Sequence, residues 1–167
     1  MTFVAGSYDV QAPSDPPAPS DDAIGRISFT DGTTTIGPVP VYGSSFGVTA
    51  SASSGSQSGG AGAGKATFSD FTVRKSLDAA SDPLLAATLA GTHWRSAKLE
   101  LFDSAGSTAV RHTYDLSDVS VVSFRDKATG QTSTSSVQED VVLRASGYAQ
   151  TDGGHTTCWN VATNAGC

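Results

Sequence analysis

The chain has 167 residues, a formal net charge of −6 and only 16% charged residues. This length predicts one domain with a modest core. The acidic balance argues against nucleic acid as a partner, because phosphate binding requires clusters of Lys and Arg. No apolar run reaches the roughly 20 residues that span a bilayer, so we expect no membrane insertion. The start, MTFVAGSYDV, lacks the basic and apolar regions of a signal peptide.

Two segments differ in composition from the rest. Residues 11–22, QAPSDPPAPSDD, predict a Pro-rich N-terminal arm over residues 1–23, followed by one domain over 24–167. Residues 49–64, TASASSGSQSGGAGAG, bury almost nothing and predict a long Gly/Ser loop. Loops of this length inside a compact domain are usually functional or disordered.

The remaining sequence predicts a mainly β fold of seven or eight strands, typical of a barrel or sandwich. Pro38 and Pro40 confine the start of the second strand to an edge or a bulge. Phe68 and Phe71 do not share a face under strict alternation, which predicts a bulge near residues 69–70. A turn is expected at 103–106 and a strand end at 126–130. The predicted strands are 24–30, 39–49, 64–75, 97–101, 110–116, 119–125, 137–149 and 157–161.

One short helix is predicted over residues 82–91. Asp82 is the expected N-cap, with Pro83 at the first helical position and Gly91 as the C-terminal stop. Four residues predict the side that the helix packs: Leu84, Leu85, Thr88 and Leu89.

Both cysteines lie in the C-terminal tail, residues 158–167. A Cys158–Cys167 disulfide is the favoured interpretation, worth about 2–3 kcal/mol in the chain-entropy model. Two free thiols are the alternative. Zinc is not expected, because only His155 is near as a further ligand. A disulfide predicts a protein that acts outside a reducing cytosol.

The sequence does not predict catalysis, a cofactor or a metal. The segment 43–47, GSSFG, has the spacing of a nucleophile elbow, but it lies on a predicted strand rather than at a strand-to-helix turn. Glu139 and Asp140 are adjacent and therefore face opposite sides of their strand, which is unsuited to paired acid–base chemistry. Three histidines are each expected in structural roles: His93, His112 and His155.

The order of these elements resembles the Hcp family, the tube protein of bacterial type VI secretion systems. A Gly-rich loop is followed by a strand, a helix that begins near Pro-Leu, and a late strand with Trp-Asn. An early element lies at 42–47 and the late strand at 159–164. The other matching residues are Gly64-Lys65, Asp70-Phe71, Lys75, Asp78, Pro83-Leu84 and Gly91-Thr92-His93.

The resemblance implies an Hcp-like β-barrel of two sheets with one short α-helix on its side. It also implies hexameric rings that stack into a hollow tube and carry small effector proteins in the lumen. Such a protein is secreted to the cell exterior, with assembly in the cytoplasm before export. The long loop would then contact the neighbouring ring through Ser51, Ser53, Ser54, Ser56, Gln57 and Ser58.

Three features depart from the family pattern: the arm, a short segment between Ile27 and Val41, and the cysteine pair. They leave open an exported Hcp-like binding module, or an extracellular filament protein independent of a contractile machine. Trp94 and Trp159 would be candidate stacking residues of such a module, although packing roles are favoured for both. A secreted effector that uses the barrel as a carrier is a further alternative, but no appended domain is present in this sequence.

Overall fold

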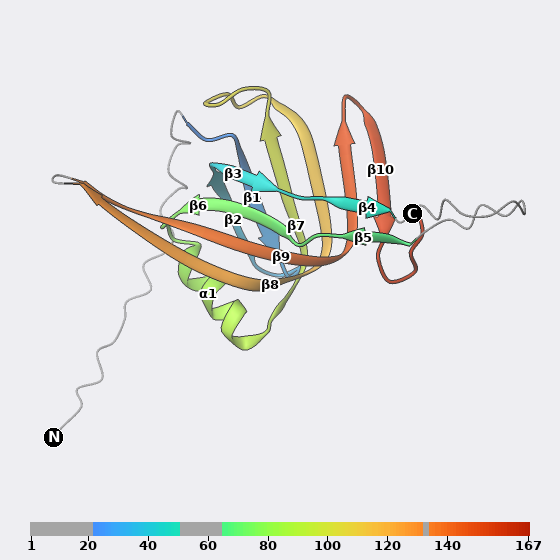
Figure 1. The fold of residues 1–167 in the computed structure, drawn as a ribbon, viewed down its shortest axis with the longest axis horizontal. Helices are drawn as coiled ribbons and strands as arrows, with labels where there is room; N and C mark the ends of the chain where they lie inside the picture. Colours follow the sequence, from blue (N-terminus) through green and yellow to red (C-terminus); the bar gives the residue numbers. More distant parts are fainter. Residues whose placement is uncertain (1–21, 51–64, 132–133) are drawn as a thin grey trace, which may run out of the picture.

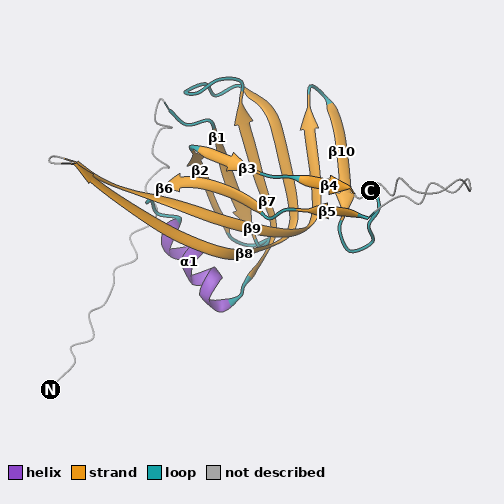
Figure 2. Ribbon diagram, viewed as in Figure 1, coloured by secondary structure: helices purple, strands orange, loops and turns teal. Residues whose placement is uncertain are grey.

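A computed structural model describes residues 22–50, 65–131 and 134–167. In these ranges the chain forms strands and one helix (Figures 1 and 2). In chain order they are β1 (Gly25–Thr30), β2 (Thr35–Val41), β3 (Gly43–Ser45), β4 (Val48–Ala50), β5 (Ala66–Phe68), β6 (Phe71–Ser76), α1 (Ser81–Ala90), β7 (His93–Phe102), β8 (Val110–Gln131), β9 (Thr134–Asp152) and β10 (His155–Asn160).

Eight strands form one curled antiparallel sheet in the order β2-β1-β7-β8-β9-β6-β3, with β10 beside β9. Its two ends belong to one stretch of chain, because only Tyr42 separates β2 from β3. β2 pairs with β1, and β3 pairs with β6. The N–H of Tyr42 donates to the carbonyl of Arg74 at 2.8 Å. The segment 35–45 therefore bridges both ends of the sheet and curls it into a barrel.

The core fills the inside of this curled sheet. Buried and half-buried residues alternate along the whole length of β1, so one face of this strand points into the core. The helix contributes Leu84, which is fully buried, and packs against β8. The largest fully buried apolar side chains are Phe29, Phe71, Ile27, Leu84, Leu99, Leu116 and Leu143. The predicted class, mainly β with one short helix on the side of a barrel, is confirmed.

The predicted strand 39–49 was wrong as a single element. The chain leaves β1 for β6 at Tyr42, and then forms β4 in a separate two-stranded sheet with β5. The predicted strand 64–75 divides for the same reason. Ser69 marks the division, since its hydroxyl accepts the Gly47 N–H at 2.8 Å and its own N–H donates to the Gly47 carbonyl at 2.9 Å. The expected bulge at 69–70 is therefore a change of sheet.

The prolines of β2 behave as predicted. Within the described residues β2 is paired with β1 alone, at one end of the strand order. The register shifts between Ile27 and Phe29, opposite the part of β2 that contains Pro38. Pro40 stands across from Arg26. Proline has no N–H donor, and it is accepted at an edge or an irregularity because no strand hydrogen bond requires a donor there.

The strand end predicted at 126–130 was wrong. β8 continues to Gln131, because residues 125–131 pair with residues 134–140 of β9. Figure 1 shows this hairpin extending well beyond the barrel. Charged and small residues such as Asp126 and Ala128 are exposed there, so the sequence pattern resembles a loop although the backbone stays paired.

The helix begins one residue earlier than predicted, and Asp82 is not its N-cap. Ala80 holds that position without a side-chain cap, and Asp82 and Pro83 lie inside the first turn. Proline and an acidic residue are both accepted there. The predicted packing side was also wrong in part, because Leu85 is 39% exposed and Leu89 80% exposed. Gly91 ends the helix as predicted, with a left-handed φ of 64°.

Candidate functional site

β4 and β5 form a ribbon that carries the long Gly/Ser segment. Val48 pairs with Phe68 and Ala50 with Ala66, so residues 51–64 join the two free ends of this ribbon. The residues predicted to contact a neighbouring ring all lie in that segment, outside the described residues: Ser51, Ser53, Ser54, Ser56, Gln57 and Ser58.

A stack of aromatic rings fixes the root of the ribbon to the barrel. The ring of Phe46 lies 5.2 Å from that of Phe71 and 5.0 Å from that of Tyr148. Phe68 stacks on Tyr148 at 5.0 Å with an interplanar angle of 5°. Burial raises the pKa of Tyr148, and burial together with the Asp152 charge raises the pKa of Tyr114, so both phenols stay neutral. The root therefore packs the ribbon against the barrel through aromatic contacts.

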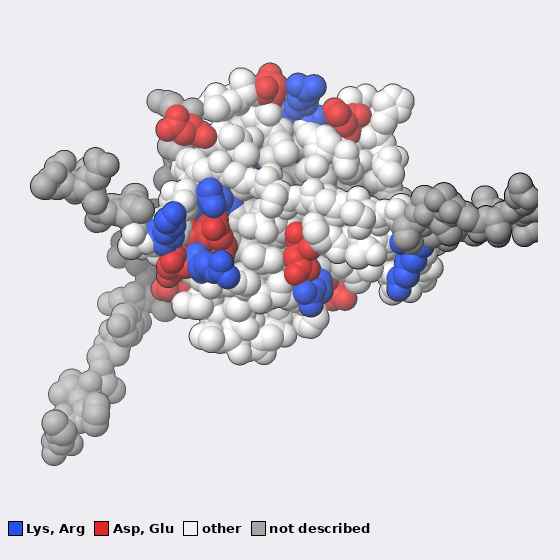
Figure 3. Space-filling view, in the orientation of Figure 1, with Lys and Arg blue, Asp and Glu red and all other residues white. Residues whose placement is uncertain are grey.

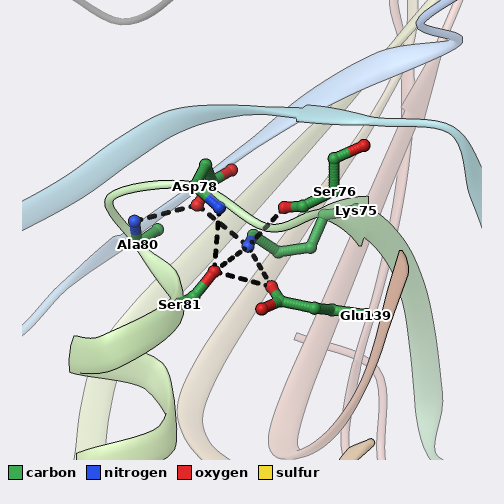
Figure 4. Close-up of polar contacts among 6 residues, drawn as sticks. All are labelled: Lys75, Ser76, Asp78, Ala80, Ser81 and Glu139. Atoms are coloured by element: carbon green, nitrogen blue, oxygen red, sulfur yellow. Dashed lines mark hydrogen bonds and ion pairs between the residues drawn. The ribbon is translucent and has the colours of Figure 1, made fainter. Parts of the chain in front are cut away.

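A buried polar cluster joins β6, β9 and the start of α1 (Figure 4). Lys75 and Glu139 face each other across the two strands, and both are fully buried. The Lys75 ammonium donates to the Glu139 carboxylate, to the Ser81 hydroxyl at 2.9 Å and to the Ser76 carbonyl at 2.8 Å. It also lies 2.9 Å from a carboxylate oxygen of Asp78. Ser81 in turn donates to Glu139 at 2.8 Å.

The burial of this cluster indicates a structural role. The side chains of Lys75 and Glu139 are 0% and 1% exposed, so no reagent reaches them. Asp78 accepts the Ala80 N–H at 2.8 Å and ties the turn before α1 to the same ammonium group. Sequence reasoning missed the pair, although strand alternation contains the signal. Lys75 follows Phe71 and Val73 at spacing two, on the inward face.

The same strands carry ion pairs on their outer face. Arg74 donates to both carboxylate oxygens of Asp140, at 2.8 and 3.3 Å, and this interaction lowers the pKa of Asp140. Arg144 binds Asp70 in the same bidentate way, at 2.9 Å for each bond. Figure 3 shows charged side chains gathered over the part of the surface formed by β6, β8 and β9. Glu139 and Asp140 thus face opposite sides of β9, as predicted.

One serine, histidine and aspartate do lie together on the surface. His93 Nδ1 is 3.0 Å from the Ser120 hydroxyl and 3.4 Å from Asp118. Both contacts use the same ring nitrogen, whereas a proton relay needs the serine and the carboxylate on different nitrogens. The His93 side chain is also 62% exposed, so water is not excluded. This arrangement does not build an activated nucleophile.

The other two histidines lie near the first residues of β8 and β10. His112 packs its ring 4.6 Å from that of Tyr114 and lies 3.7 Å from Asp152. His155 pairs with Asp152 across the β9–β10 turn. No group of three potential ligands among the described residues is placed to hold a metal ion. In the same part of the chain, no helix is long and apolar enough to cross a membrane.

The C-terminal tail is closed by a disulfide. Cys158 on β10 is bonded to Cys167, with Cα atoms 5.6 Å apart. Asn160 and Ala165 pair between them, through N–H to carbonyl bonds of 2.8 and 3.3 Å. The bond and the bridge together hold the last residues against β10, so the tail is folded up to its final residue.

The comparison with protein families decides what this fold is. The family model described as type VI secretion system effector, Hcp, matches residues 33–149. The chain belongs to the Hcp family. No curated protein sequence matches it.

Solved Hcp-related structures share this fold over nearly their full length. A type six secretion system protein superposes with a TM-score of 0.70 at 23% identity, covering 87% of this chain and 99% of that one. Hcp1 from Salmonella typhimurium gives 0.64 at 16% identity, covering 86% and 99%. The secreted protein Hcp3 from Pseudomonas aeruginosa gives 0.61 at 19% identity, covering 81% and 98%. At these identities the likeness describes the fold, and this chain is a divergent Hcp.

The Hcp-like motif residues have structural positions here. Lys75 and Asp78 belong to the buried cluster, and Asp70 pairs with Arg144. Gly91 caps the helix. The residues that carry the resemblance to the Hcp family are therefore residues that attach β6 and α1 to the barrel.

Proposed function

We propose that this Hcp-family chain is a non-enzymatic structural subunit that assembles into rings, hexameric as in the family, and that the rings stack into a hollow tube. The observation that carries the proposal is the family match over 33–149, supported by a barrel shared with a type six secretion system protein along 99% of that chain. The exposed Ser120–His93–Asp118 arrangement, with both contacts on one ring nitrogen, supports a passive role.

The ribbon gives this proposal a mechanism. The ring contacts of Phe46 and Phe68 with Tyr148 hold the ribbon against the barrel at the place from which the 51–64 segment continues. Small polar residues bury too little surface to order themselves, so their ordering free energy is offset on contact with a neighbouring ring. The subunit carries a net charge of −6, and copies repel one another at long range. Salt should therefore promote assembly by screening that repulsion.

We further propose that the tube acts in secretion, leaving the cell and delivering small effector proteins from its lumen. The Cys158–Cys167 disulfide supports an extracellular destination, since such bonds persist in oxidising compartments. No nucleic acid, membrane or cofactor is part of this proposal.

The first test is light scattering combined with negative-stain images of the purified, non-reduced protein. Rings or filaments are the expected result. A clean monomer that persists as salt is raised would overturn the tube and favour an exported binding module on the same barrel.

Two loop variants then test the stacking contact. Replacement of residues 51–63 by a short linker, with Val48–Ala50 and Ala66–Phe68 intact, should leave single rings and abolish tubes. A matched control replaces the same residues by an equally long Gly/Ser sequence in a different order, which separates length from sequence. Unchanged tubes with the short linker would remove the loop from the stacking contact.

A further inference from the structure

We propose that the acidic N-terminal arm, residues 1–21, docks on a cationic face of its own subunit formed by Arg74, Arg125 and Lys127 around Asp140. This inference goes beyond the tube, because it concerns each subunit whether or not rings form. The arm is also one of the three features that depart from the Hcp pattern.

The cationic face is a cross-strand row on the outside of the barrel. Asp140 of β9 stands between Arg74 of β6 and Arg125 of β8 in the strand register. Lys127 lies two residues further along β8 and therefore faces the same side. Asp126 falls between them and is in register with the inward-facing Glu139.

Positive charge on this face exceeds negative charge. Arg74 uses two nitrogens on Asp140, at 2.8 and 3.3 Å. Arg125 and Lys127 are exposed, and among the described residues neither forms an ion pair. One carboxylate thus serves three cations, in a chain whose overall charge is −6. A face of this kind is complementary to an acidic segment.

A hollow next to the row provides room for an extended chain. Its volume is about 210 Å³. It is lined by backbone and small hydroxyl side chains from β3 and β6 together with the ion pair: Gly43, Ser44, Ser45, Thr72, Arg74 and Asp140. Within the described residues, β3 pairs only with β6, so its other edge has no strand partner.

The described chain begins close to this hollow. Gly25 of β1 pairs with Val41, and the N–H of Ile24 donates to the Val41 carbonyl at 2.9 Å. Val41 lies two residues before Gly43, where β3 starts, so Ile24 lies close to one end of β3. Ala23 is fully buried and its carbonyl accepts the Gly106 N–H, which fixes the exit point.

The composition of the arm fits the face. Residues 1–21 contain Asp9, Asp15 and Asp21 and no Lys or Arg, because the first basic residue of the chain is Arg26. Four prolines within 11–22 favour an extended polyproline conformation, in which 21 residues span up to about 65 Å. A tethered arm has an effective concentration on the order of millimolar, so docking on its own subunit is favoured over docking on a neighbour.

Zero-length carbodiimide coupling of the full-length protein tests the proposal. The reagent activates an aspartate carboxylate, the Lys amine displaces it, and an amide forms with net loss of water. Trypsin then leaves the arm as one peptide ending at Arg26, and its coupled lysine is identified by mass. We expect coupling to Lys127, with little at the exposed Lys65 and Lys98. Equal coupling to all three lysines would overturn the proposal.

A mixture of ¹⁵N-labelled and unlabelled protein distinguishes a subunit's own arm from a neighbour's. Coupled peptides of uniform isotope content are expected. Mixed-isotope peptides would overturn docking within one subunit and assign the arm to an adjacent copy. Because the readout is made on monomers and on rings alike, failure here leaves the tube proposal unaffected.

Substitutions provide a second readout that does not depend on coupling chemistry. Chymotrypsin cleavage after Tyr8 should be about threefold to tenfold faster in R125Q/K127Q than in the parent at low salt, as expected for the loss of two exposed ion pairs. High salt should accelerate the parent to the same rate. R95Q/R111Q, which removes two exposed cations elsewhere, is the matched control and should cleave like the parent. Equal rates for both variants would contradict a docked arm.

Discussion

Two ion pairs occupy adjacent positions of the same two strands and lie in opposite environments. Lys75 and Glu139 face into the barrel and are fully buried, whereas Arg74 and Asp140 face outward, with side chains 48% and 33% exposed. Water solvates the outer pair, so a charge that loses its partner there is still compensated by solvent. The inner pair has been removed from water, and each charge depends on the other for compensation. Burial is therefore expected to make the inner pair matter more to the stability of this fold than the outer pair.

The largest effect is expected for Lys75→Met. It leaves the Glu139 carboxylate buried without its cation, and removing one partner of a buried pair costs about 3–5 kcal/mol. Urea unfolding followed by circular dichroism measures the free energy of unfolding. Arg74→Met is the matched control, because it removes a cation of similar length from the adjacent, outward position and should change stability little.

The double variant K75M/E139M sharpens the same comparison. Replacing both charges by apolar side chains of similar volume removes the uncompensated carboxylate, so much of the lost stability should return. A double variant as unstable as K75M alone would show that the cluster acts through its hydrogen bonds to α1 rather than through charge.

A smaller effect is expected for Ser81→Ala. The Ser81 hydroxyl accepts from Lys75 and from the Asp78 N–H, and donates to Glu139. Removing it leaves buried polar groups with fewer partners, at a cost of about 1–3 kcal/mol. Unfolding in urea measures this loss. Stability equal to that of the parent would mean that the cluster rearranges around Lys75.

Gly91→Ala tests the other end of the helix, where no charge is involved. The residue has a φ of 64°, and a Cβ there meets no atom within 4 Å. The expected loss of about 1–2 kcal/mol therefore reports left-handed backbone strain alone. Thermal unfolding measures it, with exposed Gly153→Ala at φ 55° as a second position of the same kind. A loss larger than that of S81A would reverse the predicted order.

The smallest effect is expected for Asp140→Asn, and it should depend on pH. The hydrogen bonds from Arg74 lower the folded-state pKa of Asp140 below its ordinary value of 3.8. The contribution of the carboxylate is then fully present above about pH 4 and is lost as pH falls through the lowered pKa. The stability difference between parent and D140N should be constant near neutral pH and vanish under stronger acid. A difference that grows on acidification would contradict this assignment.

The sequence predicted features that depend on local chemistry. Gly91 at the helix end and the prolines of β2 are single-residue constraints on φ or on N–H donors, and both were correct. The helix start was misassigned because Asp82 has the chemistry of a cap, while the tertiary contact of Asp78 with Lys75 sets where the turn closes. Leu89 shows the same limit, since helical spacing cannot decide which side of a short helix meets the sheet.

Long-range pairing was harder to predict. The segment from Arg125 to Gln131 contains charged and small residues and resembles a loop, yet it stays paired because β9 continues opposite it. The division at Ser69 likewise depends on a partner, Gly47, more than 20 positions earlier in the chain. The buried Lys75–Glu139 pair was within reach, because alternation with Val73 and Val141 places both charges inward.

The ribbon of β4 and β5 lies outside the main sheet, which the chain leaves after Ser45 and rejoins at Phe71. A segment attached there can change length with only a slow, logarithmic change in loop-closure entropy, about 0.6 kcal/mol for each doubling. The length of the 51–64 segment can therefore change with little effect on the stability of the barrel. Insertions between Ala50 and Ala66 are therefore expected to change the length of this segment at little cost to the stability of the barrel.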